Sequence, residues 1–375
     1  MSLVTPIITP IDTSIDLLNA VALRSTEGLQ AARHLGDYDS IIDARSPAEF
    51  AQDHLPGAVN WPVLDNEERR SVGTLYVQDS ALAARKVGSV MVARNVARHI
   101  EQWVQDEPRE WQPLVYCWRG GQRSGSLAWF LDQIGFRTTR LAGGYKGFRS
   151  LVRADLVSLP ETFNFRVLAG RTGSGKTRLL HALVEAGAQT LDLEGLACHR
   201  GSVLGGLPGQ AQPTQKGFDT QLWSALLRLD PSRPVFVESE SKKIGALQLP
   251  DALIQRLRGH GQVLRIEMPD AARVQLLLQE YGFFADDVER FCGLLDGLVA
   301  LRGKERVAHW QALARDGQWA HVFELLMREH YDPLYQRSMD NHFASYSSAQ
   351  EVALADGEPV TLATSAHQLL NSGAG

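Results

Sequence analysis

The stretch 115–126, which reads Val-Tyr-Cys-Trp-Arg-Gly-Gly-Gln-Arg-Ser-Gly-Ser, carries residues suited to covalent chemistry. An apolar run leads into Cys117, and two glycines then let the backbone turn its N–H groups inward. Arg119 and Arg123 add positive charge, and Ser124 is placed to cap a following helix whose N-terminus would point at the cysteine. Such surroundings lower the pKa of a thiol, and the thiolate is the nucleophilic form. The segment therefore predicts a nucleophile or group carrier for an anion, with Cys117, Arg119 and Arg123 as catalytic residues.

A second chemical pattern lies between an apolar run and an amphipathic one, and it reads Gly-Arg-Thr-Gly-Ser-Gly-Lys-Thr from Gly170 to Thr177. It is a Walker A match in the expected strand-to-helix context. The glycines let main-chain N–H groups wrap a diphosphate, Lys176 neutralises its charge, and the Thr177 hydroxyl can reach a magnesium ion. The predicted phosphate-binding residues are Gly170, Arg171, Thr172, Gly173, Ser174, Gly175, Lys176 and Thr177.

Glu238 ends a short apolar run and is the expected carboxylate for positioning a metal ion or its water. Asp192 and Glu194 are alternatives for that role. The simpler interpretation of Glu238 is an ion pair with Lys242 or Lys243. No metal ligand is firmly assigned from the sequence.

Elements of the expected folds can be placed around these two patterns. Short β-type runs are expected at 38–43, 189–192, 234–238 and 261–267, and helices at 217–229 and from Asp270 to about Glu329. Their order predicts an α/β protein with two parallel sheets and a helical C-terminal region. Residues 330–335 are expected to end the helical run, with aromatic groups that either stack a base or pack as a corner.

The composition is that of a two-domain globular protein. The 375 residues are 44% hydrophobic and 22% charged, with a net charge of −5. Without a long apolar segment or a leader pattern, the sequence predicts a cytoplasmic protein with no membrane association. Cys117, Cys198 and Cys292 have no metal-ligand spacing. Nucleic-acid binding would need a local basic patch, for which Arg85, Lys86, Arg94 and Arg98 are candidates, although a solvated helix face is the default interpretation.

Four pieces of the first half together resemble the rhodanese family. They are Asp-Ala-Arg-Ser-Pro-Ala-Glu-Phe from Asp43, His-Leu-Pro-Gly-Ala-Val-Asn from His54, the cysteine loop, and Leu-Ala-Gly-Gly-Tyr ending at Tyr145. Asp43 and Arg45 would then support the loop scaffold, and His54 would be a turn residue. Five residues separate Cys117 from Arg123, one more than in sulfurtransferase rhodaneses, so the cradle should be wider. Phosphatases of this fold carry a histidine before the cysteine, whereas Tyr116 stands here.

The domain organisation follows from both patterns. We expect a rhodanese-like domain at 12–150 with a helical insertion at about 66–102, and a connecting segment at 151–162. A P-loop NTPase-like domain is expected at 163–350 with a helical region at about 270–335, followed by a C-terminal tail at 351–375.

The order of the modules, the insertion Asn-Glu-Glu-Arg-Arg-Ser-Val-Gly-Thr from Asn66, and both loops together closely resemble the bacterial tRNA 2-selenouridine synthase family. The resemblance covers roughly residues 10 to 350. It implies a transferase that geranylates the sulfur of wobble 2-thiouridine from geranyl diphosphate and then replaces S-geranyl with selenium from selenophosphate. Cys117 would carry selenium, and Lys176 and Thr177 would stabilise the departing pyrophosphate. The implied partners are tRNA, geranyl diphosphate, selenophosphate and the enzyme that makes selenophosphate.

Other functions stay open from the residues alone. A P-loop ATPase or kinase with a regulatory rhodanese module would hydrolyse ATP without needing Cys117. A thiosulfate-type sulfurtransferase would need Cys117 but not Lys176. The sequence leaves open whether ATP or magnesium is used.

Overall fold

The computed structural model describes residues 22–23, 33–343 and 346–371, and the chain divides into two compact units. Unit 1 comprises residues 1–155 and 214–228, and unit 2 comprises residues 156–213 and 229–375. Outside the two main sheets, β1 (Ala22–Leu23) pairs with β2 (Arg33–His34) in antiparallel fashion. None of the helices in the described ranges is both long and apolar enough to cross a bilayer.

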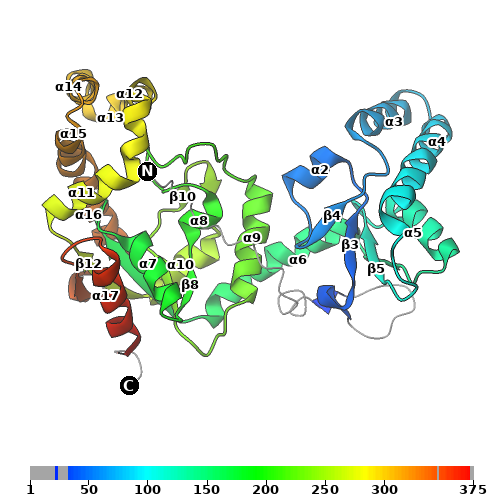
Figure 1. The fold of residues 1–375 in the computed structure, drawn as a ribbon, viewed down its shortest axis with the longest axis horizontal. Helices are drawn as coiled ribbons and strands as arrows, with labels where there is room; N and C mark the ends of the chain where they lie inside the picture. Colours follow the sequence, from blue (N-terminus) through cyan, green and yellow to red (C-terminus); the bar gives the residue numbers. More distant parts are fainter. Residues whose placement is uncertain (1–21, 24–32, 344–345, 372–375) are drawn as a thin grey trace. The chain divides into compact units, whose positions relative to one another are not determined.

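Unit 1 is built on a four-stranded parallel sheet with strand order β4-β3-β5-β6 (Figure 1). Its strands are β3 (Ser40–Asp43), β4 (Ala58–Asn60), β5 (Pro113–Tyr116) and β6 (Thr139–Arg140). Its helical segments are η1 (Leu35–Asp37), α2 (Pro47–Gln52), α3 (Asn66–Gln78), α4 (Ala81–His99), the π-helix η2 (Ile100–Val104), α5 (Gln122–Ile134), α6 (Gly144–Ser158) and α9 (Gln215–Leu227). Strand β5 is buried along its whole length, and the cysteine loop follows directly at its C-terminal end.

The expected helical insertion forms the pair α3 and α4. Asp65 and Glu68 make a reciprocal capping box at the start of α3, and Ser80 caps α4 through the N–H of Ala83. Gly88 allows the close approach of Val72, because an added Cβ would lie 3.3 Å from both Val72 methyl groups.

Unit 2 is built on a five-stranded parallel sheet with strand order β13-β12-β7-β9-β8. Its strands are β7 (Phe165–Gly170), β8 (Gln189–Leu191), β9 (Val235–Glu238), β12 (Gln262–Glu267) and β13 (Gln350–Ala353), and β10 (Lys243–Ile244) pairs with β11 (Leu247–Gln248) as a hairpin. Strand β7 is central, and its C-terminal end lies between β12 and β9 where the strand order reverses. Ligands bind at such switch points in open α/β sheets.

Helices surround this sheet and continue into a separate helical cluster. They are η3 (Leu159–Thr162), α7 (Lys176–Glu185), α8 (Leu193–Ala197), α10 (Asp251–His260), α11 (Asp270–Tyr281), η4 (Gly282–Asp286), α12 (Val288–Asp296), α13 (Val299–Arg302), α14 (Lys304–Arg315), α15 (Trp319–Leu326), the π-helix η5 (Met327–Tyr331), α16 (Asp332–His342), η6 (Tyr346–Ser348) and α17 (Pro359–Asn371). The helices from α11 to η5 share a core that includes Phe284, Phe291 and Trp310, all fully buried. The α/β fold predicted from the sequence, with a P-loop-like second domain and a helical C-terminal region, is confirmed.

Three boundaries differ from expectation. Residues 351–371 are not a tail: β13 pairs with β12, and Leu362, Ala366 and Leu369 of α17 pack into the core beside α7. The connecting segment 151–162 has the helix expected to end near Pro160, with α6 running to Ser158 and η3 following, but it is not a separate linker, because residues 151–155 belong to unit 1 and residues 156–162 to unit 2. Residues 330–335 do not end the helical run, since η5 continues directly into α16.

Helix α9 is the fourth difference. It lies in the middle of the expected P-loop domain, yet it belongs to unit 1. Sequence order alone gives no sign of this, because its apolar pattern suits burial in either unit.

Candidate functional site

The cysteine loop holds a buried thiol at the C-terminal end of β5. The Ser124 hydroxyl donates to Cys117 Sγ at 3.2 Å. Burial would raise the pKa of this thiol, but hydrogen bonds from the Ser124 hydroxyl and from the backbone N–H groups of Ser124 and Arg119, with the charge of Arg123, lower it. The predicted N–H cradle is therefore present. Ser124 is not the N-cap of α5, which is Gly121.

The Leu-Ala-Gly-Gly-Tyr segment closes over this loop. The backbone N–H of Tyr145 donates to the Cys117 carbonyl at 2.8 Å, and the N–H of Lys146 donates to the Trp118 carbonyl at 2.9 Å. Gly144 has φ of +55°, and an added Cβ there would clash with the Cys117 carbonyl and lie 2.5 Å from the Gly120 nitrogen. This close approach requires glycine.

The two arginines of the loop differ in their surroundings. Arg123 forms an ion pair with Glu49 at 2.5 Å, so its charge is partly neutralised. Arg119 is exposed and, within the described residues, has no acidic partner. It lines an open depression together with Lys146 and Ser150. Lys146, which sequence reasoning missed, therefore adds a second cation beside the loop.

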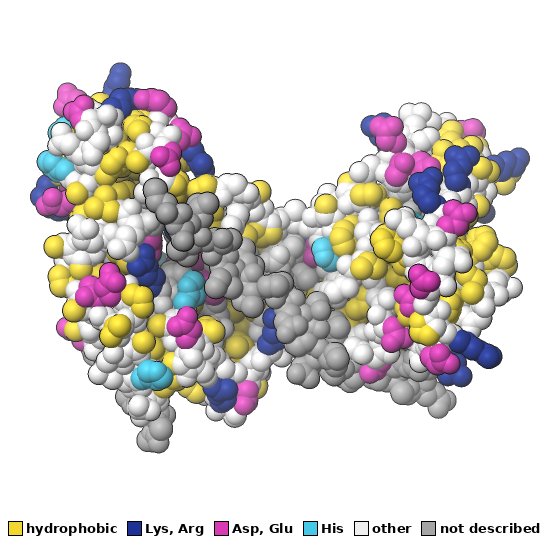
Figure 2. Space-filling view, in the orientation of Figure 1, with side chains coloured by type: hydrophobic (Ala, Val, Ile, Leu, Met, Phe, Trp, Pro, Cys, Tyr) yellow, Lys and Arg dark blue, Asp and Glu magenta, His cyan; other side chains and the backbone are white. Residues whose placement is uncertain are grey.

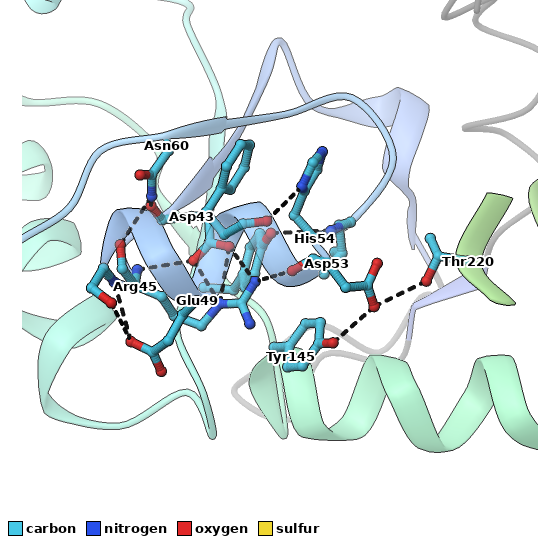
Figure 3. A network of polar contacts seen from close by, with 12 residues as sticks. Asp43, Arg45, Glu49, Asp53, His54, Asn60, Tyr145 and Thr220 are labelled. Atoms are coloured by element: carbon cyan, nitrogen blue, oxygen red, sulfur yellow. Dashed lines mark hydrogen bonds and ion pairs between the residues drawn. The ribbon is translucent and has the colours of Figure 1, made fainter. Parts of the chain in front are cut away.

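A buried polar network supports the base of the loop (Figure 3). Arg45 is 1% exposed and pairs with Asp43 at 2.6 Å, while it also donates to the Asp53 carbonyl at 2.7 Å. Its guanidinium lies 3.8 Å from the centre of the Tyr145 ring. The His54 ring stacks on the Phe50 ring with their centres 3.9 Å apart, and its Nδ1 lies 3.0 Å from the Phe50 carbonyl oxygen. These contacts agree with a structural role for the Asp43–Arg45 pair.

The Walker A segment connects β7 to α7. Gly170 ends β7, Gly173 and Gly175 have φ of +75° and +78°, and Lys176 begins α7. In the structure Lys176 Nζ donates to the carbonyls of Gly170 at 2.6 Å and Arg171 at 3.4 Å. Within the described residues, the Lys176 ammonium thus bonds only to carbonyls of its own loop, and a bound phosphate would offer it stronger, charged acceptors.

The Arg171 and Thr172 positions contact the helical cluster. The Arg171 side chain lies within 3.5 Å of carboxylate oxygens of Glu267, Asp270 and Asp332, so only its backbone is directed at the loop. The Thr172 carbonyl accepts from Arg273, which is fully buried and paired with Asp332 at 2.5 Å.

Arg273 and Asp332 therefore fix the loop from α11 and α16, and sequence reasoning missed both. Asp332 could have been suspected only because it lies within the aromatic segment 330–335.

Three carboxylates gather near Thr177. The Thr177 hydroxyl donates to Glu194 at 3.3 Å. Burial and the neighbouring carboxylates raise the pKa of Glu194 to about 8 and of Glu240 to about 7, and they raise that of Glu238 as well. Glu238 is 1% exposed, and neither of its carboxylate oxygens has a hydrogen-bond partner among the described residues.

Other buried polar atoms near the loop also have no hydrogen-bond partner in the described part of the chain: Ser174 Oγ, Ser239 Oγ and Tyr335 Oη. Lys176 Nζ lies 5.7 Å from the Tyr335 ring centre, so the aromatic segment reaches the phosphate loop. Unpartnered buried polar groups are costly, and a bound polar ligand would satisfy them. Asp192 is otherwise engaged, since it caps α8 and bonds to His181.

Two family models match the chain in the same order as the two units. A rhodanese-like domain matches residues 25–151, and a tRNA 2-selenouridine synthase AAA domain matches residues 163–302. The tRNA 2-selenouridine synthase of Verminephrobacter eiseniae is 35% identical over 335 residues, which are 81% of this chain and 90% of that protein. This chain belongs to the tRNA 2-selenouridine synthase family.

Other members of the tRNA 2-selenouridine synthase family match to different extents. The protein of Cupriavidus pinatubonensis is 33% identical over 79% of this chain and 87% of its own length. That of Nitrosomonas europaea is 39% identical over 64% of this chain, and the match spans 63% of its length. The match to the Nitrosomonas protein thus covers less than two thirds of that relative.

Proposed function

We propose that this protein is a tRNA-modifying transferase that converts wobble 2-thiouridine to 2-selenouridine in two steps. The sulfur is first geranylated from geranyl diphosphate, and selenium from selenophosphate then replaces the S-geranyl group. The proposal is supported by the presence, in one chain of this family, of a hydrogen-bonded thiol with a lowered pKa and of a Walker A loop beside buried polar groups that have no partner in the described residues.

The first step would use unit 2. The thiocarbonyl sulfur forms a bond to the terminal carbon of the geranyl group as the carbon–oxygen bond to the diphosphate breaks. Main-chain N–H groups of 170–177 and the Lys176 ammonium would bind the diphosphate and stabilise the charge of the departing pyrophosphate. Lys176 would exchange the carbonyls of Gly170 and Arg171 for phosphate oxygens.

A magnesium ion fits the residues beside this loop. Thr177 offers a hydroxyl, and the unpartnered carboxylate of Glu238 could hold the ion or its water, with Glu194 close to both. When bound, the ion would supply further positive charge to the pyrophosphate. It would also favour the charged form of the neighbouring carboxylates, whose pKa values are raised without it.

The second step would use unit 1. Alkylated sulfur is a better leaving group than a thiocarbonyl sulfur, so the carbon–selenium bond can form as the carbon–sulfur bond breaks. The selenium of selenophosphate would displace geranylthiolate from this carbon, and water would then cleave the selenium–phosphorus bond to release phosphate. The Cys117 loop would bind the selenium donor, and Arg119 and Lys146 would attract its anionic phosphoryl group. Arg123 would lower the thiol pKa while held by Glu49.

Nucleoside mass spectrometry of tRNA from a strain lacking this protein tests both steps. Complementation with the wild type should restore 2-selenouridine. Cys117→Ala should accumulate S-geranyl-2-thiouridine, and Lys176→Ala should leave 2-thiouridine. If neither modified base depends on the protein, the proposal is wrong, and ATP hydrolysis that depends on Lys176 but not on Cys117 would favour an ATPase with a regulatory rhodanese module.

A further inference from the structure

Helix α9 is part of unit 1 although its sequence lies inside the matched AAA domain, residues 163–302. Several contacts along the helix join it to unit 1. Its N-cap residue Thr214 donates to the Gln52 carbonyl. Farther along the helix, Trp223 donates to Asp155 at 2.8 Å, and its ring packs edge-on against Phe148.

The centre of this contact is the buried carboxylate of Asp53. One oxygen, Oδ2, accepts from the Tyr145 hydroxyl at 2.8 Å and from the Thr220 hydroxyl at 3.1 Å. Figure 3 shows Tyr145 and Thr220 pointing at this oxygen from two different elements. Arg149 lies 3.5 Å from the same oxygen. Asp53 is 4% exposed, and Thr220 is the residue of α9 that donates to its carboxylate.

Arg149 is held mainly by α9. It donates to the Asp219 carboxylate at 2.7 Å, to the Thr220 hydroxyl at 3.0 Å and to the Lys216 carbonyl at 3.1 Å. Without α9, Arg149 would lose its bonds to Asp219, Thr220 and Lys216, and Asp53 would lose the bond from Thr220. Removing a partner from a buried charge is strongly destabilising, so we expect α9 to stabilise unit 1 through these contacts.

Tyr145 connects this cluster to the reactive thiol. Its hydroxyl is fixed by Asp53, its ring lies against Arg45 and Trp118, and its backbone N–H donates to the Cys117 carbonyl. Its neighbour Gly144 touches the same carbonyl. A shift of the Tyr145 side chain therefore moves the segment that closes the N–H cradle.

We infer that α9 positions the cysteine loop, with Thr220 acting as a positioning residue through Asp53 and Tyr145. The inference rests on the proposed function only for the view that Cys117 is the reactive group. Thr220 does not touch the thiol, so its effect must appear in the reactivity of Cys117 and not merely in folding.

The test is the rate at which iodoacetamide alkylates Cys117 in the full-length protein, measured by peptide mass spectrometry across pH. Thr220→Val keeps the shape of the side chain and removes the hydroxyl. It should slow alkylation at pH 7 about fivefold and move the profile to higher pH, because it loses the buried hydrogen bonds to Asp53 and from Arg149. Thr220→Ser should restore the wild-type profile.

Ser224→Ala is the matched control, because Ser224 is buried one turn along α9 and its hydroxyl has no partner among the described residues. It should leave the profile unchanged. The inference would be overturned if Cys117 in Thr220→Val were alkylated at the wild-type rate, or if Thr220→Ser and Thr220→Val slowed the alkylation equally. The assay uses no tRNA, so it can succeed or fail independently of the proposed function.

Discussion

The cysteine loop and the Walker A loop have the same local architecture but differ in how their polar groups are bonded. Each follows a buried parallel strand, turns on glycines and leads into a helix. In unit 1 most of the buried polar groups around the thiol are bonded, because Ser124 bonds to Cys117, Arg123 pairs with Glu49, and the Tyr145 N–H donates to the Cys117 carbonyl. In unit 2, Ser174, Ser239 and Glu238 are buried without partners in the described residues, and Lys176 bonds only to its own loop.

Under the proposed function, this difference would separate two kinds of anion site. The cysteine loop is organised in advance around an atom that the protein itself supplies. The Walker loop leaves its polar groups for a ligand to satisfy. We expect substitutions in the first loop to disturb folding and thiol reactivity, and substitutions in the second to disturb ligand binding.

Gly144→Ala should give the largest effect. The added Cβ meets backbone atoms at Cys117 and Gly120, and φ of +55° is unfavourable for alanine. We expect a loss of about 3 kcal/mol in unfolding free energy together with altered Cys117 alkylation. Urea denaturation and alkylation rates measure both. Gly121→Ala is the matched control, because nothing lies within 4 Å of a Cβ there. Equal stability of the two variants would contradict the preorganised loop.

Lys176→Ala should weaken binding of inorganic pyrophosphate about 100-fold, which is the scale of lost charge-assisted hydrogen bonds. Isothermal titration calorimetry measures the change. Cys117 alkylation should be unaffected in this variant, and Cys117→Ala should bind pyrophosphate like the wild type. Undiminished binding by Lys176→Ala would show that the loop does not take a diphosphate.

Ser124→Ala should raise the pKa of Cys117, because the hydrogen bond from the Ser124 hydroxyl is a principal cause of its lowering. Less thiolate is then present at pH 7, so alkylation there should slow about tenfold and converge with the wild type at high pH. Ser126→Ala on the same helix removes only an exposed bond to the Gln122 carbonyl and serves as control. An unchanged profile for Ser124→Ala would mean that the cradle depends on backbone groups alone.

The carboxylates of unit 2 predict a dependence of stability on pH. The folded pKa values of about 7 for Glu240 and about 8 for Glu194 lie above the ordinary 4.5, so the folded state binds extra protons. The contribution of these two groups to the free energy of unfolding is fully present below about pH 4.5 and is lost as pH rises through 7 to 8. Glu240→Gln should therefore raise Tm at pH 8 by about 2–4 °C and less at pH 5. Scanning calorimetry at pH 5 and pH 8 measures the Tm, and Glu185→Gln, at an exposed position, is the control.

The smallest effect is expected on the helical pair α3 and α4, where basic side chains gather in Figure 2. Arg94 is exposed and has no acidic partner in the described structure. If this face meets an RNA backbone, Arg94→Gln should weaken tRNA binding about threefold and reduce the salt dependence by about one charge. Arg70→Gln on α3, whose charge is paired with Glu67, is the control. Equal binding by both variants would leave α4 a solvated face.

Local patterns predicted both loops because their chemistry is contiguous in sequence. The strand, the glycines and the helix around Lys176 occupy one short segment, and so do those around Cys117. The supports come from far along the chain. Arg273 reaches the Thr172 carbonyl from 101 residues away, and Thr220 reaches Asp53 from 167 residues away. Their sequence surroundings carry no motif, because any buried polar residue on a helix has the same local pattern.

The carboxylate beside Thr177 illustrates the same limit. The strand pattern favours Glu238, and Glu238 is buried beside the loop, but the Thr177 hydroxyl donates to Glu194. The choice depends on how β8 and β9 lie next to each other in the sheet. Parallel neighbours are set by long-range packing, which the order of elements constrains only partly.

The place of α9 has a consequence for the protein during its synthesis. When residue 155 leaves the ribosome, the first unit still lacks a helix that begins after residue 213. At about 5–20 residues per second, the intervening chain takes several seconds to make. During that interval Asp53 and Arg149 lack the partners that α9 supplies. The buried polar network of unit 1 can therefore be completed only after α9 has been synthesised.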